Sequence, residues 1–198
     1  MKYMKYIKLR QLNKRLYFKT DDLADALGIK KNSSKVACNR YVKKGIIIRL
    51  KKDFYILREK WEHLEKGEFL KLANFLQVPS YISFMTALSF YEITTQVQRR
   101  FFESACLKRS RTFEIDDVVF NFYKIKREYY FDFSKTNEIF MASKEKAFVD
   151  CIYLYSFGKY KIDLNSLDID KLDRAKIKEI LNVYPQKTRK AVETLCKI

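Results

Sequence analysis

The stretch TDDLADALGIKKNSSKVACNRYVKKGIIIRLKKDFYIL, residues 20–57, decides the fold of the N-terminal part of this chain. Thr20 is a good helix N-cap, and Asp21 and Asp22 follow it where a helix N-terminus favours negative charge. Gly28 comes directly after a short apolar face and is the residue type that most often ends a helix. The first eight positions therefore predict a short helix.

A second helix is predicted after a turn at residues 29–32. Asn32 or Ser33 can cap it, and Gly45 ends it. Its predicted apolar face consists of Val36, Ala37, Tyr41 and Val42. Two short helices joined by a tight turn are typical of the helix-turn-helix.

The residues that follow predict a hairpin with a basic tip. Residues 46–50 form a β-branched run, residues 51–53 form a turn, and residues 54–57 form a second strand. Residues 1–14, with lysines and apolar positions at helical spacing, predict a preceding helix. The order of these elements predicts a winged helix-turn-helix.

The outward face of the second helix carries polar and basic residues. Asparagine reads adenine, arginine reads guanine, and serine and lysine hold the phosphate backbone. The predicted DNA-contacting residues of this face are Ser33, Ser34, Lys35, Asn39, Arg40 and Lys43. A solvated face on a helical hairpin would have a similar composition, but the order of helix, turn, helix and basic hairpin favours DNA binding.

The positive charge is concentrated in the same part of the chain. The net charge is +17, and residues 1–60 hold 18 Lys and Arg against 5 Asp and Glu, whereas residues 61–198 hold 23 against 19. A polyanionic partner with salt-dependent binding is expected. An acidic membrane would also attract this charge, but we find neither a long apolar run nor a signal peptide and expect a cytoplasmic protein.

The 198 residues predict two domains in an α+β chain. Residues 1–60 form the winged helix-turn-helix, and residues 61–198 form an α+β domain that opens with a linker at residues 61–67. Its strand-like segments are residues 100–107, 112–115, 118–125, 129–133 and 139–142. They predict a small antiparallel sheet, which C-terminal helices follow from Ser143 onward.

Little in the sequence indicates catalysis. The cysteines Cys38, Cys106, Cys151 and Cys196 match no metal motif and His63 is the single histidine, so reduced core thiols and no metal site are expected. With 4 glycines a phosphate-binding loop is implausible, and no cofactor is expected.

A metal-dependent nuclease is the alternative that the acidic residues leave open. Its candidate carboxylates are Glu114, Asp116, Asp117, Asp132, Glu145 and Asp150. However, Asp116 and Asp117 more simply make a turn. Glu145 suits the first turn of a helix, and Asp150 can pair with Lys146. We therefore expect no enzyme.

A second basic cluster lies in the C-terminal part and consists of Arg99, Arg100, Lys108, Arg109 and Arg111. It predicts either solvated strand ends and a turn, or a second nucleic-acid surface. Nearby aromatic residues could stack on bases, although packing in the core of a small sheet is the simpler interpretation. They are Tyr123, Tyr129, Tyr130 and Phe131.

Several motifs in this order resemble one family. They are YIS at 81–83, ALSFY at 87–91, TTQ at 94–96, KRSR at 108–111 and SKEKAFVD at 143–150. Together with the N-terminal winged helix they make the chain similar, over nearly its whole length, to the AbiEi-type antitoxins. These are predicted regulators of viral defence in type IV toxin–antitoxin and abortive-infection systems.

The resemblance implies a repressor of its own operon that binds inverted repeats of double-stranded DNA at the promoter. It also implies a C-terminal domain that counteracts a nucleotidyltransferase-type toxin without a stable complex. Arg49, Lys51 and Lys52 would be the DNA-contacting residues of the wing. Two molecules would bind each repeat, either as monomers that pair on DNA or as a preformed dimer. The open alternative is a protein-interaction module that sequesters a toxin directly.

Overall fold

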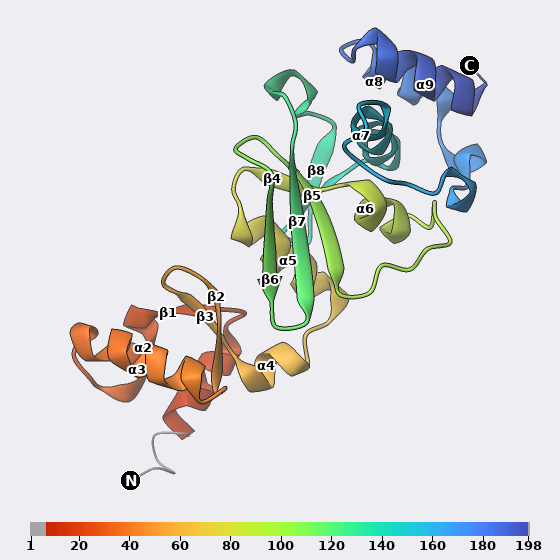
Figure 1. Ribbon diagram of the computed structural model, residues 1–198. Helices are drawn as coiled ribbons and strands as arrows, with labels where there is room; N and C mark the ends of the chain where they lie inside the picture. The colour runs from red at the N-terminus through yellow and green to blue at the C-terminus, as the bar shows by residue number, and fades with distance from the viewer. Residues whose placement is uncertain (1–6, 198) are drawn as a thin grey trace. The chain divides into compact units, whose positions relative to one another are not determined.

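The computed structural model describes residues 7–197. The chain divides into two compact units, Met1–Phe69 and Leu70–Ile198 (Figure 1). The first unit extends beyond residue 60, where the sequence predicted the boundary. Residues 1–6 of the predicted N-terminal helix lie outside the described residues, and residues 7–10 are helical.

The first unit combines short helices with a small sheet. After the helical residues 7–10, its elements are η1 Gln11–Lys14, β1 Phe18–Lys19, α2 Thr20–Leu27, α3 Lys31–Lys43, β2 Ile47–Lys51, β3 Phe54–Leu57 and α4 Arg58–Glu62. The antiparallel sheet has the order β1-β3-β2. The two helices and the hairpin that the sequence predicted are confirmed, whereas β1 was not predicted.

Two helix starts differ from the prediction. Lys19, not Thr20, is the N-cap of α2, and its N–H donates to the Asp22 carboxylate at 2.7 Å. The buried Thr20 hydroxyl instead donates to Asp53 in the turn of the hairpin. Helix α3 begins at Lys31, before either predicted cap. The start of α2 is thus set by a capping box within its own first turn, and Gly28 ends α2 in the left-handed conformation, as predicted.

The first unit has one apolar core, to which its helices before α4 and all three strands contribute. Its buried residues are Leu9, Leu12, Phe18, Leu23, Ala37, Cys38, Tyr41, Ile47, Tyr55 and Leu57. Trp61 is only 2% exposed and packs edge-to-face on Phe69 with the ring centroids 5.3 Å apart. The predicted linker at residues 61–67 is therefore wrong, because these residues belong to α4, a short turn and the start of α5.

The second unit is a sheet with helices. Its elements are α5 Lys66–Leu76, which begins in the first unit, β4 Ser80–Ile82, α6 Phe84–Phe90, β5 Phe101–Cys106, β6 Arg111–Ile115, β7 Val118–Lys124, η2 Arg127–Tyr129, β8 Phe133–Thr136, β9 Ile139–Ala142, α7 Lys144–Ser156, η3 Leu164–Ser166, η4 Ile169–Lys171, α8 Arg174–Leu181 and α9 Gln186–Cys196. The α+β class is therefore confirmed.

The sheet of the second unit is mixed, so the predicted antiparallel sheet is wrong. Its order is β6-β7-β5-β4-β9-β8. Strand β7 pairs in parallel with β5 because it lies between β5 and β6, and β4, which was not predicted, pairs in parallel with β9. Residues 129–133 were predicted as a strand, but they hold the end of η2 and only the first residue of β8.

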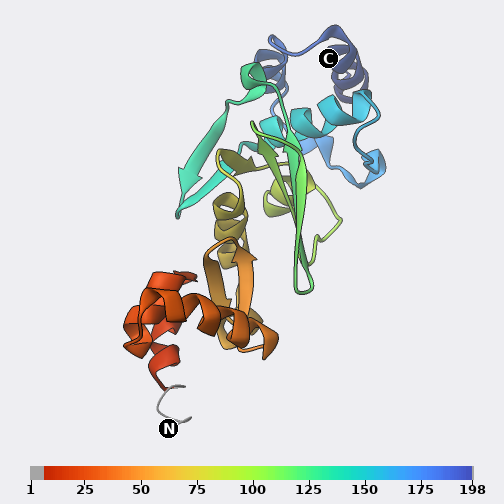
Figure 2. The same cartoon turned by 60° about the vertical axis from the view of Figure 1, so that its left-hand side comes forward.

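Helix α7 is the centre of the second unit. It packs against α6 and β9 on the sheet side, and α8 and α9 pack against it on the other side (Figures 1 and 2). Ser143 caps it through a hydrogen bond from the Lys146 N–H. Within residues 7–197, no helix combines the length and the apolar character that crossing a membrane requires.

A buried charged pair lies inside this packing. Lys146 and Asp150 are both 0% exposed and form an ion pair. The Asp150 carboxylate also accepts hydrogen bonds from the hydroxyls of Tyr81 at 2.9 Å, Ser83 at 2.8 Å and Tyr184 at 2.9 Å. The sequence predicted this pair, and the structure shows that it is buried. Burial lowers the pKa of Lys146, and the adjacent Asp150 carboxylate opposes this shift.

Candidate nucleic-acid interface

Helix α3 turns one side to the core and the other to solvent. Its buried side consists of Ser34, Ala37, Cys38 and Tyr41, which recur at helical spacing. Its solvent side, called the α3 face below, consists of Ser33, Lys35, Val36, Asn39, Arg40 and Lys43, all exposed. Five of the six predicted DNA-contacting residues of this helix therefore share one face.

Two positions of α3 were predicted on the wrong side. Ser34 is 0% exposed and its hydroxyl donates to the Lys31 carbonyl at 2.8 Å, so it does not belong to the α3 face. Val36, predicted in the core, is 68% exposed. The serine tolerates burial because its hydroxyl is satisfied by the preceding turn of its own helix.

The hairpin contributes Arg49 to the same surface. This residue is exposed on β2, and its guanidinium donates to the Asn39 side-chain oxygen at 2.5 Å. The guanidinium also lies over the Tyr55 ring, 5.5 Å from the centroid, and contacts the Tyr55 hydroxyl at 3.4 Å. A bidentate asparagine–adenine contact uses both the oxygen and the nitrogen of the amide. Arg49 therefore fixes the orientation of Asn39 on the α3 face.

The tip of the hairpin carries the two predicted lysines. Lys52 is exposed, and the Lys51 ammonium lies 5.2 Å from the centroid of the Phe54 ring. Lys19 of β1 lies at the same distance from that ring. Asp53 has a φ of 65°, and its hydrogen bond from Thr20 holds the turn against the start of α2. The charges of the tip are thus carried by an anchored turn.

The pKa values of two residues of α3, Lys31 and Cys38, are raised for different reasons. Lys31 forms an exposed ion pair with Asp21 at 2.7 Å, and the hydrogen bond from this ammonium raises the pKa of Lys31. Cys38, in contrast, lies in the core, where burial raises the pKa of its thiol to about 11. The cysteine is consequently a protonated core residue at neutral pH, as the sequence predicted.

The second predicted basic cluster is not one patch. Arg99 and Arg100 precede β5, and Arg100 forms an ion pair with Asp117 in the turn between β6 and β7. Lys108 and Arg109 follow the end of β5. A strand of this length, Phe101–Cys106, spans roughly 20 Å at about 3.3 Å per residue. The cluster therefore splits into two groups at opposite ends of one strand.

The later members of the cluster are partly engaged in local contacts. The Arg111 guanidinium lies 4.2 Å from the centroid of the Phe113 ring. The Arg109 carbonyl accepts a hydrogen bond from the Gln77 amide at 2.9 Å. Both contacts lie within the second unit.

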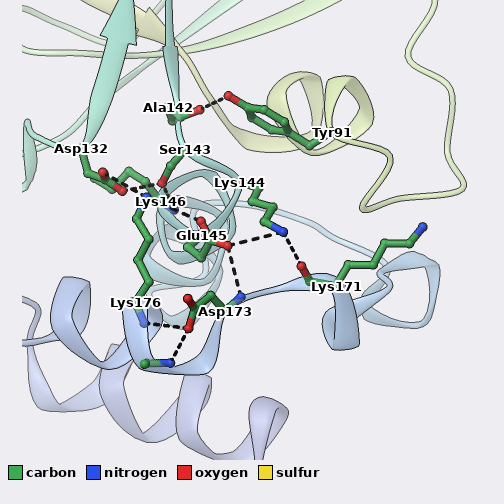
Figure 3. Close-up of polar contacts among 11 residues, drawn as sticks. Tyr91, Asp132, Ala142, Ser143, Lys144, Glu145, Lys146, Lys171, Asp173 and Lys176 are labelled. Atoms are coloured by element: carbon green, nitrogen blue, oxygen red, sulfur yellow. Dashed lines mark hydrogen bonds and ion pairs between the residues drawn. The ribbon is translucent and has the colours of Figure 1, made fainter.

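Two candidate carboxylates of the nuclease alternative, Asp132 and Glu145, share a lysine neighbour, because the Lys176 ammonium lies 3.4 Å from the first and 3.7 Å from the second. Glu145 is 3% exposed at the start of α7, where it accepts a hydrogen bond from the Asp173 N–H at 3.1 Å and lies near the Lys144 and Lys176 ammoniums at 3.8 and 3.7 Å (Figure 3). Asp116 lies in the turn between β6 and β7. Among residues 7–197, no three acidic, histidine or cysteine side chains converge as a set of metal ligands.

No family model matches the chain, and no curated protein matches it. The fold, however, is similar to that of the RV2827C protein from Mycobacterium tuberculosis, with a TM-score of 0.64 and 8% sequence identity. The match covers 95% of this chain and 74% of the other. At this identity the likeness shows a shared fold alone.

Proposed function

We propose that this chain is a DNA-binding transcriptional repressor whose first unit acts as a winged helix-turn-helix. The observation that carries the proposal is the α3 face, where exposed Lys35, Asn39, Arg40 and Lys43 lie on one side of a helix and Asn39 is bonded to Arg49 of the adjoining hairpin. Helix α3 would enter the major groove, and the hairpin would contact the flanking backbone.

In this proposal the residues of the surface have different tasks. Arg40 and Asn39 read guanine and adenine, and Val36 contacts a thymine methyl group, because an exposed apolar side chain among base readers suits that partner. Ser33, Lys35, Lys43, Lys51 and Lys52 contact phosphates. Two molecules would occupy the two halves of an inverted repeat.

The experiment that tests this proposal is a salt titration. Binding to the DNA upstream of the protein's own gene is compared with binding to a random duplex of equal length. We expect a large preference for the upstream DNA with similar salt slopes, since phosphate contacts set the slope and base contacts set the preference. Equal affinity for both duplexes would contradict base reading by the α3 face.

We further propose that the repressor is the antitoxin of a type IV toxin–antitoxin pair and counteracts a nucleotidyltransferase-type toxin. The support is the resemblance of residues 81–83, 87–91, 94–96 and 143–150 to the AbiEi-type antitoxins. Co-expression with the product of the adjacent gene tests it. Restored growth without co-purification is expected. Stable co-purification would favour direct sequestration, and unrestored growth would contradict the antitoxin role.

A further inference from the structure

A small aromatic cavity lies in the second unit, far in the sequence from the α3 face. It has a volume of about 260 Å³ and lies between η2, the C-terminal end of α7 and the residue that precedes α9. Its walls include the rings of Tyr129, Tyr153 and Phe157, together with Pro185. In Figure 2 the loop after β7 reaches the α7 and α9 end of the unit.

The rings of the cavity are fixed by contacts with one another. Tyr153 meets Tyr129 edge-to-face with the centroids 4.9 Å apart, and meets Phe157 edge-to-face at 5.5 Å. Tyr129 also stacks on Tyr184 at 4.4 Å, which anchors it in the core. Phe157, in contrast, is 43% exposed, so an aromatic ring is offered to solvent at the mouth.

The rim of the cavity is cationic. Lys126 and Lys159 are exposed lining residues, and the lining set includes no carboxylate. The Lys187 ammonium lies over the Phe157 ring, 5.2 Å from its centroid. Glu128 pairs with Lys126 at 3.4 Å, but both side chains are more than half exposed, so the pair is readily exchanged for another anion.

We propose that this cavity binds one base of a single-stranded nucleic acid or a free nucleotide, with the base against the aromatic rings and the adjoining phosphate on the lysines. Aromatic platforms combined with cationic rims are the usual means of binding unpaired bases. Pockets for drug-sized ligands start at about 300 Å³, so the volume of about 260 Å³ suits one planar base and leaves its phosphate outside. This site is distinct from the proposed duplex-binding surface.

Photocrosslinking gives a local test that binding by the first unit does not disturb. The full chain is irradiated with an eight-nucleotide oligo-dU that carries 5-iodouracil, and the crosslinked peptides are identified by mass spectrometry. We expect crosslinks at the residues that line the cavity, above all at Tyr129, Tyr153 and Phe157. Efficient crosslinking that is confined to segments outside this lining would overturn the proposal.

Affinity measurements supply the second test. Phe157→Ala is expected to weaken oligo-dU binding about 5- to 150-fold, which corresponds to the stacking of one base, and it should fold because this residue is 43% exposed and lies outside the buried core. Lys159→Ala should weaken binding and lower the salt slope by about 0.7. Lys178→Ala, which removes an equal charge from an exposed position on α8, is the matched control and should change little.

Two competitors identify the source of the ligand. Competition by uridine monophosphate at a matched nucleotide concentration would assign a free nucleotide, whereas competition by oligomers alone would assign a strand. Both outcomes support the proposed chemistry. Equal competition by an oligoglutamate peptide, or equal losses in Phe157→Ala and Lys178→Ala, would overturn it, because charge alone would then explain binding.

Discussion

Asp150→Asn should destabilise the second unit severely, because it leaves a buried ammonium without its counter-ion. Lys146 and Asp150 are both 0% exposed, so water cannot replace the lost charge. The Lys146 ammonium would keep its hydrogen bond to the Tyr81 hydroxyl, at 2.9 Å, but this hydroxyl is neutral and does not replace the lost counter-ion. Removing one member of a buried pair costs about 3–5 kcal/mol. For a unit of this size the melting temperature should fall by roughly 10–20 °C.

The same reasoning predicts a rescue by a second substitution. Lys146→Met added to Asp150→Asn removes the unpaired charge. An asparagine oxygen in the Oδ2 position can still accept from the hydroxyls of Tyr81 and Ser83, and the amide N–H in the Oδ1 position can donate to the Tyr184 hydroxyl oxygen. The double variant should therefore be more stable than Asp150→Asn alone, as measured by calorimetry and by the near-ultraviolet circular dichroism of the tyrosines. A double variant that is no more stable than Asp150→Asn would refute the argument.

The pH dependence of the unfolding free energy gives an independent check on the role of Asp150. Burial lowers the pKa of Lys146, and without Asp150 nothing from that carboxylate opposes the shift. Between this lowered pKa and the unfolded value of 10.5, the unfolded chain binds a proton that the folded chain has lost. The free energy of unfolding of Asp150→Asn therefore rises with pH in that interval. The difference in unfolding free energy between the wild-type protein and Asp150→Asn should therefore narrow as the pH becomes alkaline. A difference that stays constant with pH would contradict the unpaired-charge explanation.

The remaining predictions concern DNA binding and one further buried carboxylate. Arg40→Ala should cost about 1–3 kcal/mol on the upstream DNA and relax its sequence preference, whereas equal losses on random DNA would make Arg40 a phosphate contact. Lys51→Ala should weaken binding to all duplexes alike in the same titration, and a sequence-selective loss would argue against backbone contacts by the hairpin. Replacing single thymines by deoxyuridine should weaken wild-type binding at one position by about 0.8 kcal/mol and leave Val36→Ala insensitive there; a profile that is the same for both proteins would remove Val36 from base reading. Burial raises the pKa of Glu103 from 4.5 to about 7, so its stabilising protonated form is lost as pH rises through 7. Unfolding measured from about pH 5 to 8 should therefore show the wild-type protein losing stability relative to Glu103→Gln, and parallel curves would refute this titration.

The elements that the sequence predicted correctly are those that local signals define. Gly28 and Gly45 both have positive φ values, 65° and 67°. Gly28 directly follows α2, and Gly45 lies two residues after the last residue of α3. Ser143 caps α7 as predicted, and Pro185 immediately precedes α9. Each of these signals acts within a few residues, so it is visible without knowledge of the fold.

The elements that were missed depend on distant partners. Strand β4 has three residues, Ser80–Ile82, and exists because it lies between β5 and β9. Strand β1, with two residues, exists because β3 offers an edge. The parallel pairing of β5 with β7 likewise requires β6 to take the outer position. A local pattern predicts a strand but contains nothing about which neighbour it pairs with.

The candidate site shows the same division at the level of single side chains. A helix repeats every 3.6 residues, so positions 34 and 36, two residues apart, lie on nearly opposite sides. The apolar character of Val36 and the polar character of Ser34 predicted the reverse of what the packing selects, because the buried side is fixed by Cys38 and Tyr41 against the core. Assigning Ser34 to the buried side and Val36 to the exposed side leaves the other five predicted DNA-contacting residues on one face, because the spacing among those five residues is unaffected. The composition of the α3 face was therefore predictable, whereas its one apolar member required the packing, and a thymine-to-deoxyuridine comparison isolates the part of DNA recognition that the sequence alone would have assigned to the core.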